Sequence, residues 1–390
     1  MLNEKLALHT PGPTPIPPQV SAAMTQPMIN HRGEGFSRLY RDVTAKLQTV
    51  FQTKEQVYVL AGSGSAGWET AMVNFVPAGA KVLNIVIGDF GERWVKANRA
   101  LGYQVERLDY PIGTAARSED VDAFLSKQEG TIQAVCLQHN ETSTGVSNPV
   151  HEIAKVIQQH GALVFVDAVS SLGALPLPMD EWGLDVVFTG SQKALMFPPG
   201  LMMIAASQKA WAQAEKADAP RFFFDLKGHR DGFAKGQTPQ TPAISLLYGL
   251  QAALDMVLAE GVEQGQERHH LMGEMARAGA QATGLELLCQ DEGFASNTVT
   301  AVKIPQGVDA STFRKVALKS FGVVLAGGQG KIMKDMIFRI GHMGYVTPND
   351  VLVALAAVEN SLASLGYPVQ IGNAVAAAQR VWLLQVSANK

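Results

Sequence analysis

The chain has 390 residues, more than a single hydrophobic core usually supports, so two domains are expected. Hydrophobic residues make up 47% and charged residues 17%, a balance typical of a well-packed enzyme and not of a disordered protein. The net charge of −3 without a basic stripe argues against nucleic-acid and anionic-membrane partners, and two lone cysteines, Cys136 and Cys289, argue against disulfide scaffolds and cysteine-rich zinc sites.

The first predicted feature is an N-terminal arm over residues 1–18. Residues 10–18 contain five prolines, which exclude a helix or a central strand there, and they lead into the first helix. The start of the chain lacks the apolar core of a signal peptide, and no run of about 18 apolar residues predicts a membrane span. Together with the low cysteine content, this predicts a cytoplasmic protein.

A large domain is expected over residues 19–260, because short β-rich runs alternate there with helical patterns such as 92–101 and 148–159. The predicted strands are 57–60, 82–87, 134–137, 163–167, 186–189 and 201–206. Nearly unbroken apolar strands that alternate with helices predict an α/β fold with a mainly parallel sheet covered on both faces. Ligands of such sheets bind beyond the carboxyl ends of the strands, where the candidate site residues lie.

A smaller α+β domain is expected over residues 261–390. One helix is predicted over 244–260, and after Gly261 a long helix over 262–283 is expected to bridge to this domain. Within it, the sequence predicts strands at 297–303 and 337–340 and helices at 311–320 and 348–365. The last residues, from 367 onward, are mildly amphipathic, and no functional role is predicted for them.

A lysine and an aspartate lie at the ends of two predicted strands. Lys193 follows the apolar run 186–188 and precedes a Pro-Pro-Gly turn at 198–200, and Asp167 ends the apolar run 163–166. A lysine that forms a Schiff base and a carboxylate that keeps the pyridine nitrogen protonated are the groups that pyridoxal phosphate chemistry requires. A solvated loop lysine, and an aspartate paired with a backbone N–H or an arginine, are the structural alternatives.

Three more segments that follow predicted strands carry candidate ligand contacts. The glycine-rich turn at 62–67 precedes a helical pattern from Trp68, and free N–H groups at a helix start bind phosphate, although many such turns bind nothing. Phe90 would stack on a pyridine ring or simply pack in the core. The short polar side chains of 139–145 would contact a cofactor or cap a turn.

Arg339 ends an apolar strand of the predicted smaller domain. A guanidinium group matches a carboxylate in two-point geometry, and amino donors and 2-oxo acid acceptors both carry that carboxylate. An interdomain salt bridge is the alternative role.

Several short motifs follow one another along the chain: PGP at 11–13, GSG at 62–64, NETSTG at 140–145, VDAVSS at 166–171, GSQK at 190–193, PPG at 198–200 and FRIGHMG at 338–344. In this order, they resemble the motifs of class V, fold type I aminotransferases that depend on pyridoxal phosphate, particularly the alanine–glyoxylate and serine–glyoxylate branch. The resemblance covers almost the whole chain and implies a seven-stranded, mainly parallel sheet in the large domain.

The resemblance implies a role for each matching residue. Lys193 would form the Schiff base and Asp167 would contact the pyridine nitrogen. The other cofactor contacts would come from Ser63, Gly64, Ser65 and Gln192 at the phosphate, Phe90 on the ring and Thr142 near the phenolic oxygen. Arg339 and Gly12 would bind the substrate.

One implied contact crosses to a second subunit. Thr241 would reach the phosphate bound by the other subunit, which implies a homodimer with shared active sites. Many relatives carry a tyrosine three residues before that threonine, where this chain has Thr238, so this part of the phosphate site is left undefined. His31 and Arg32 follow the arm and would line the pocket or form a dimer contact.

The implied reaction transfers an amino group from a small amino acid, serine or alanine, to glyoxylate or a similar small 2-oxo acid. The alternatives within the fold are aspartate–glyoxylate or pyridoxamine–pyruvate transamination, a cysteine desulfurase or another lyase, and a non-catalytic relative. A desulfurase needs a cysteine on a mobile loop, whereas Cys136 lies in a predicted core strand and Cys289 lies outside any glycine-rich loop.

Overall fold

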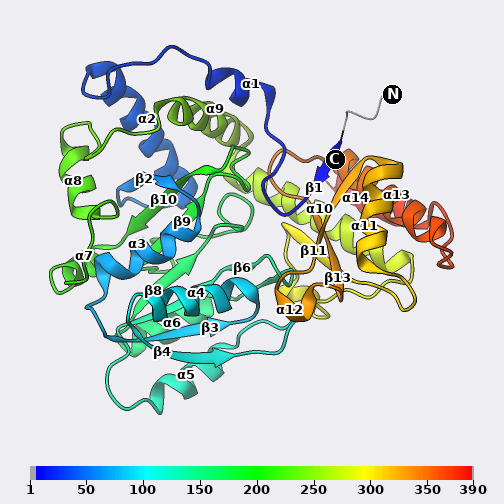
Figure 1. Cartoon of the computed structure of the whole chain (residues 1–390), viewed down its shortest axis with the longest axis horizontal. Coiled ribbons are helices and arrows are strands. Elements are labelled where there is room, and N and C mark those ends of the chain that lie inside the picture. Colours follow the sequence, from blue (N-terminus) through cyan, green and yellow to red (C-terminus); the bar gives the residue numbers. More distant parts are fainter. Residues whose placement is uncertain (1–5, 389–390) are drawn as a thin grey trace.

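A computed structural model describes residues 6–388 of the chain, and Figure 1 shows two β-sheets side by side, each with its own helices. The larger sheet has seven strands in the order β2-β10-β9-β8-β5-β3-β4. Its strands are β2 (Val57–Gly62), β3 (Lys81–Val86), β4 (Gln104–Asp109), β5 (Ala134–Gln138), β8 (Leu163–Asp167), β9 (Val186–Gly190) and β10 (Gly200–Ala206). Only β10 runs antiparallel to its neighbours, so the predicted mainly parallel sheet is confirmed.

Helices cover both faces of the large sheet because its strands are apolar on both sides. One face packs against α1 (Pro18–Ala23), α2 (Glu34–Phe51), α5 (Ser118–Ser126), α6 (Val150–Gln159) and α9 (Ile244–Glu260). The other face packs against α3 (Ser65–Phe75), α4 (Asp89–Ala100), α7 (Gln208–Ala214) and α8 (Leu226–Ala234). The three-layer arrangement leaves the carboxyl ends of the parallel strands as the place for a ligand.

The sequence missed β4 and misplaced two helix starts. Strand β4 lies at the edge of the sheet and carries Glu106, Arg107 and Asp109, so it lacks the unbroken apolar run of a central strand. Helix α3 begins at Ser65 and α4 at Asp89, each three residues before the predicted starts. Glycines and a first-turn aspartate occupy these starts, and they hide the helical periodicity of the first turn.

The smaller sheet has four strands in the order β1-β12-β13-β11. Its strands are β1 (Ala7–His9), β11 (Val299–Lys303), β12 (Val323–Gly327) and β13 (Ile337–Gly341), and its helices are α10 (Val262–Ala282), α11 (Ala310–Phe321), α12 (Gly330–Met333), α13 (Pro348–Ser364) and α14 (Asn373–Ala388). Strands β1 and β12 and helices α12 and α14 were not predicted. The short hairpin of β6 (Asn140–Glu141) and β7 (Val146–Ser147) and a 3-10 turn (Glu292–Phe294) complete the elements.

The N-terminal arm joins the smaller sheet. Strand β1 pairs in parallel with β12, with Ala7 opposite Val323 and His9 opposite Leu325. Figure 1 shows the segment after β1 crossing from the smaller sheet toward α1. The arm therefore connects both parts of the structure, and the division at residue 261 stays a prediction.

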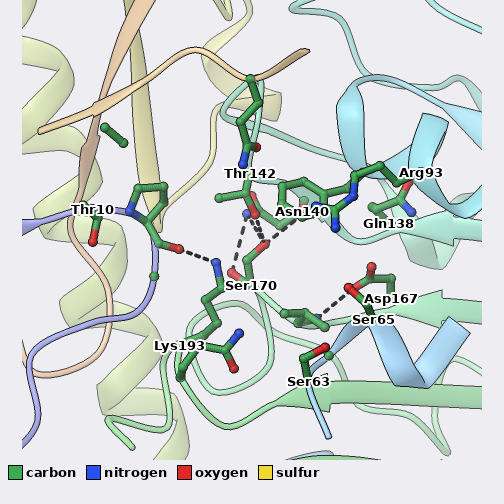
Figure 2. Close-up of a pocket in the computed structure, with 18 of the residues that line it drawn as sticks. Thr10, Ser63, Ser65, Arg93, Gln138, Asn140, Thr142, Asp167, Ser170 and Lys193 are labelled. Atoms are coloured by element: carbon green, nitrogen blue, oxygen red, sulfur yellow. Dashed lines mark hydrogen bonds between the residues drawn. The ribbon is translucent and has the colours of Figure 1, made fainter. Parts of the chain in front are cut away.

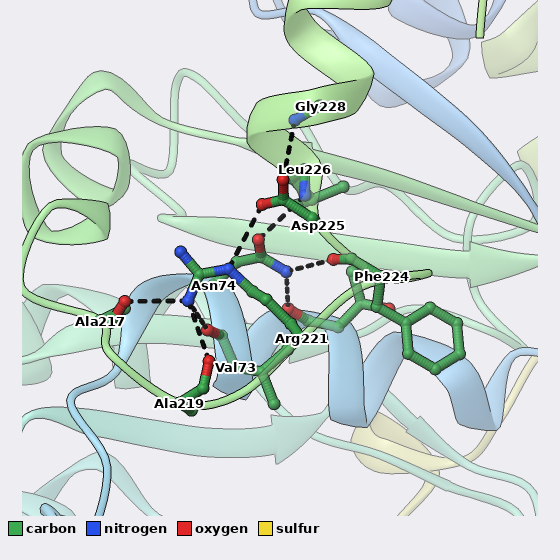
Figure 3. Close-up of polar contacts among 10 residues, drawn as sticks. Val73, Asn74, Ala217, Ala219, Arg221, Phe224, Asp225, Leu226 and Gly228 are labelled. Atoms are coloured by element: carbon green, nitrogen blue, oxygen red, sulfur yellow. Dashed lines mark hydrogen bonds and ion pairs between the residues drawn. The ribbon is translucent and has the colours of Figure 1, made fainter. Parts of the chain in front are cut away.

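The loop between α7 and α8 is tied to α3 by an arginine and an asparagine (Figure 3). Arg221 donates to the carbonyl oxygens of Val73, Ala217 and Ala219 and pairs with Asp225. Asn74 donates to Phe224 O and accepts from Leu226 N. These bonds satisfy backbone groups that the irregular loop would otherwise leave unpaired, and they hold α3 in place.

Within the described part of the chain, no single helix is long and apolar enough to cross a membrane. Helices α9 and α10 meet such a criterion only when taken together, and they are bent by 82° relative to each other.

Candidate active site

A cavity of about 320 Å³ lies where the carboxyl ends of β5, β8 and β9 face the smaller sheet (Figure 2). Its walls come from the arm, the starts of α3 and α4, the loops after these strands, and β12 and β13. The lining residues that the sequence predicted are Gly12, Ser63, Gly64, Ser65, Phe90, Thr142, Asp167, Gln192, Lys193 and Arg339. The ten predicted residues therefore line one cavity, although the first and the last of them, Gly12 and Arg339, lie more than 300 positions apart in the sequence.

Lys193 is buried, with 8% of its surface exposed, so it is not a solvated loop lysine. Its Nζ donates a hydrogen bond to the carbonyl oxygen of Pro11. Burial, and then the nearby charge of Arg339, lower the pKa of Lys193 to about 8, while the carboxylate of Asp167 opposes this shift. A buried amine with a pKa close to neutral is suited to gain and lose a proton at physiological pH.

Asp167 ends β8 and is held by two donors. Its Oδ1 accepts from the backbone N–H of Val169 at 2.9 Å, and its Oδ2 accepts from the indole N–H of Trp68 at 2.8 Å. Burial raises the pKa of Asp167 to about 6, against these hydrogen bonds and the charges of Lys193 and Arg93. The carboxylate is therefore pre-oriented and ionised at pH 7.

The glycine-rich turn places the start of α3 against the cavity. Gly64 is the N-cap of this helix, and no side chain caps its first-turn N–H groups. A Cβ at Gly64 would lie 2.5 Å from Val169 Cγ2, so a larger residue would not fit between the turn and the loop after Asp167. Two first-turn N–H groups, those of Ala66 and Gly67, bond to carbonyl oxygens within the turn, and the remaining N–H groups at the start of this 11-residue helix suit an anionic group.

Phe90 lies just past β3, which ends at Val86, as the second residue of α4. Its N–H and that of Gly91 each donate to Glu141 Oε2 at 3.1 Å, and the Ser143 hydroxyl also donates to this carboxylate. Glu141 is fully buried, and burial raises its pKa although these hydrogen bonds oppose the shift. The carboxylate fixes the helix start and thereby the position of the Phe90 ring at the cavity wall.

Arg339 lies on β13 and makes no salt bridge within residues 6–388, which rules out the interdomain ion pair for this part of the chain. Its Nε donates to Gly327 O at 2.9 Å and its Nη1 to Thr142 O at 2.8 Å and Gln329 Oε1 at 3.3 Å. Burial lowers its pKa to about 10, so it stays charged at neutral pH. The guanidinium is oriented by backbone carbonyls and keeps its charge for a ligand.

Thr142 belongs to a polar network that joins the two parts of the structure. Its hydroxyl donates to Ser170 Oγ at 2.8 Å, and Asn140 Nδ2 donates to Ser170 Oγ at 2.8 Å and to Thr298 Oγ1 at 3.0 Å. Such a fully bonded network holds its members in place.

Several predicted residues lie outside this cavity. Thr241 and Thr238 line a second, smaller cavity with His229 and Tyr40, and the Thr238 hydroxyl donates to Gln240 O at 2.7 Å. Arg32 donates to Thr238 O at 2.7 Å and does not line the main cavity. Both cysteines are buried and lie away from the main cavity, which argues against a desulfurase.

The structure places Asn140, from the candidate segment 139–145, in the cavity wall and adds lining residues that the sequence did not single out. The added residues are Thr10, Pro11, Trp68, Arg93, Gln138, Val169, Ser170, Ala326 and Gln329. Gln138 ends β5 directly opposite Asp167, and both of its side-chain polar atoms are buried without a hydrogen-bond partner among the described residues. Gln138 directly follows the predicted strand 134–137, and this position could have identified it as a site residue. Trp68 was recognised only as the start of a helical pattern.

Comparison with known proteins places this geometry in a family. The model of the family described as "Aminotransferase class-V" matches residues 7–354. The L-aspartate–glyoxylate aminotransferase of Paracoccus denitrificans is 37% identical (95% of this chain and 95% of that protein). The serine–glyoxylate aminotransferase of Arabidopsis thaliana is also 37% identical (95% and 94%).

Two further proteins are similar to this chain: a relative that is not named as an aminotransferase, and an aminotransferase whose structure is solved. A protein of Synechococcus named soluble hydrogenase, small subunit, is 42% identical over 97% of this chain and 99% of its own. The crystal structure of pyridoxamine–pyruvate aminotransferase from Mesorhizobium loti superimposes with a TM-score of 0.93 and 30% identity, covering 99% of this chain and 98% of that one. On this evidence, the chain belongs to the class V aminotransferase family.

Proposed function

We propose that this chain uses pyridoxal phosphate to transfer an amino group from a small amino acid, serine or alanine, to glyoxylate or a similar small 2-oxo acid. The observation that carries this proposal is that Lys193, Asp167 and Arg339 line one cavity, with Lys193 and Asp167 on different sides of it (Figure 2). Aminotransferase activity of the named relatives supports it.

The cavity residues fit pyridoxal phosphate. Asp167 matches a protonated pyridine nitrogen, the uncapped start of α3 matches a phosphate, and Phe90 offers an aromatic face. Buried polar atoms of Gln138 and Gln192 lack partners among residues 6–388, as expected where a polar ligand completes the bonding. The cavity volume lies near the lower end of the roughly 300–1,000 Å³ that small-molecule sites occupy.

When bound, pyridoxal phosphate supplies an electron sink for negative charge at the substrate Cα. Lys193 would take the proton from the Cα of the amino donor and, in the second half of the reaction, would supply a proton to the Cα of the new amino acid, because its buried amine has a pKa of about 8. Asp167 would hold the pyridine nitrogen with the Oδ atoms that Val169 and Trp68 already orient.

Arg339 would bind the carboxylate that donor and acceptor share. Gly327 O and Thr142 O hold its Nε and Nη1, and its Nη2 makes no hydrogen bond within the described residues. A fixed guanidinium places the substrate so that its Cα faces the lysine and not the solvent. Gly12, next to the side chain of Lys193, would be the substrate contact from the arm.

The homodimer with shared sites and the cytoplasmic location remain proposals. Thr241 does not line the main cavity of its own chain, which is compatible with a contact to the phosphate bound by a second copy. The Arg32 contacts to Thr238 and Pro239 would hold this segment in shape.

The test is a panel of amino donors assayed with glyoxylate and with pyruvate on the purified protein. We expect serine or alanine with glyoxylate to be the best pair, and Lys193→Ala to abolish turnover, whereas Lys96→Ala, on the exposed side of α4, should not. A preference for aspartate or pyridoxamine would replace the proposed donor. Turnover that survives in Lys193→Ala, or no turnover with any donor although the cofactor binds, would reject the assignment. Cofactor binding without turnover would favour a non-catalytic role. This outcome is included because the Synechococcus relative is named as a hydrogenase subunit and not as an aminotransferase.

A further inference from the structure

The segment that follows β1 passes directly over Lys193. Strand β1 ends at His9, and two residues later the carbonyl oxygen of Pro11 accepts the hydrogen bond from Lys193 Nζ. Thr14 then donates through its hydroxyl to Lys193 O at 3.1 Å and through its N–H to Gln192 O at 3.3 Å. The arm therefore contacts both the side chain and the backbone of the same lysine.

Gly12 lies next to the side chain of Lys193. A Cβ on this residue would lie 2.6 Å from Lys193 Nζ and 2.7 Å from its Cδ and Cε. These atoms are the flexible end of the lysine, so a side chain at position 12 would displace the amine and would leave the surrounding backbone in place. The φ of Gly12 is +123°, which also favours glycine.

Lys193 Nζ reaches one hydrogen-bond acceptor within residues 6–388, and that acceptor is Pro11 O. The charged groups that act on the amine are Arg339 from β13, which disfavours the ammonium form, and Asp167 from β8, which favours it. A carbonyl acceptor also favours the ammonium form, because a hydrogen bond to a charged donor contributes about 1.5–3 kcal/mol.

The arm is itself anchored to the strand that carries Arg339. His9 Nδ1 bonds to Gly341 O at 3.1 Å, and the backbone of Thr10 packs against the Cα of Gly341. A Cβ at Gly344 would lie 2.7 Å from Lys193 O and 3.0 Å from Thr14 Oγ1. The end of β13, the arm and the lysine loop thus form one packed unit.

We propose that residues 11–14 of the arm are a positioning device for Lys193, in which the Pro11 carbonyl holds the free amine and the absent side chain of Gly12 leaves room for it. The inference rests on the proposed role of Lys193 in amino transfer. The same unit places the carboxylate-binding arginine and the proton-transferring amine at a fixed separation, because β13 anchors both.

The test uses Gly12→Ala in the full-length protein freed of cofactor. Acetylation of Lys193 by acetic anhydride, followed by peptide mass spectrometry across pH 6–10, measures the pH at which the amine becomes reactive. We expect a wild-type midpoint near 8 and a downward shift of about one pH unit in Gly12→Ala, because the amine loses its acceptor. The kcat should fall about tenfold, because the displaced amine is no longer held in position for proton transfer.

Two further variants protect the test against a folding defect. Gly102→Ala, also at a positive φ (+85°) but with no atom within 4 Å, should leave the midpoint and kcat unchanged. Thr14→Val removes the bond to Lys193 O without changing backbone strain, and should lower the midpoint by a few tenths of a pH unit. An unshifted midpoint in folded Gly12→Ala, or in Thr14→Val if Gly12→Ala does not fold, overturns the inference. Acetylation reports on the amine itself, so this outcome is distinct from a failure of the transaminase assignment.

Discussion

The indole N–H of Trp68 donates to Asp167 Oδ2 at 2.8 Å, from one turn into α3 to the end of β8. Val169 N–H occupies the other carboxylate oxygen, so both oxygens of Asp167 are fixed before any ligand arrives. Trp68 also stacks on Trp94, which has no hydrogen-bond partner for its own indole N–H among the described residues. Trp68 therefore donates a hydrogen bond to the candidate catalytic carboxylate, whereas its neighbour Trp94 only packs against it.

Trp68→Phe is expected to weaken cofactor binding by about 10-fold or more. The substitution removes a hydrogen bond to a charged acceptor, which contributes about 1.5–3 kcal/mol, and it raises the pKa of Asp167 above its value of about 6. The dissociation constant for pyridoxal phosphate, measured by fluorescence titration at pH 7, checks this. Trp94→Phe is the matched control, and a similar loss of affinity in both variants would show that packing and not the hydrogen bond is responsible.

Asp167→Asn is expected to lower kcat by at least about a hundredfold while the protein stays folded. An amide cannot supply the negative charge that keeps a pyridine nitrogen protonated. Asp185→Asn is the control, because Asp185 is a buried carboxylate that accepts from Val164 N and Ser207 Oγ away from the cavity. Asp185→Asn should lower thermal stability and leave kcat per folded molecule unchanged, and the opposite ranking of kcat values would contradict the role of Asp167.

Arg339→Lys is expected to raise KM for both the donor and glyoxylate by about 10- to 100-fold, with a smaller effect on kcat. Lysine keeps the charge but loses the guanidinium geometry that Gly327 O and Thr142 O orient. Steady-state kinetics with each substrate varied in turn provides the measurement. Arg277→Lys, which changes a buried arginine bonded to Ser296 O outside the cavity, should leave both KM values alone. An unchanged KM in Arg339→Lys would remove this residue from the substrate site.

Lys193→Met is expected to stabilise the cofactor-free protein at neutral pH. Burial and the charge of Arg339 lower the pKa of Lys193 from 10.5 to about 8, so folding disfavours the charged amine. Because the folded pKa is the lower one, the destabilisation is complete below pH 8 and disappears as the pH rises from 8 to 10.5. A shift of this size corresponds to about 3 kcal/mol.

Urea titrations of wild type and Lys193→Met provide the comparison. The free energy of unfolding of the variant should be higher at pH 7 and should converge with that of wild type above about pH 10.5. Lys96→Met, at an exposed position, should show no such pH-dependent difference. Equal free energies of unfolding for wild type and Lys193→Met at pH 7 would contradict the prediction, because they would mean that the buried ammonium group does not destabilise the folded protein.

Local patterns along the chain were sufficient to predict the strands that form the centre of the large sheet. Strands β5, β8 and β9 are buried on both sides, so each is a nearly continuous apolar run. Strand β5 ends in Gln138, β8 ends in Asp167, and Lys193 lies three residues after the end of β9. Because parallel strands end at one edge, the positions of Asp167 and Lys193 near each other followed from the pattern. Strand β4 lacks this signal because it carries charged residues and is at most half-buried, and β1 lacks it because it has only three residues.

By itself, the sequence determined the fold class, the family motifs and ten residues of the candidate site, because each lies in a short motif tied to a strand or helix end. The tertiary structure alone decided which partners these residues meet: Trp68 at Asp167, Glu141 at the start of α4, and the arm at Lys193. These contacts join residues 50 to 182 positions apart. Local periodicity carries no information about such separations, and only the packing of the two sheets and the arm brings the atoms within hydrogen-bonding distance.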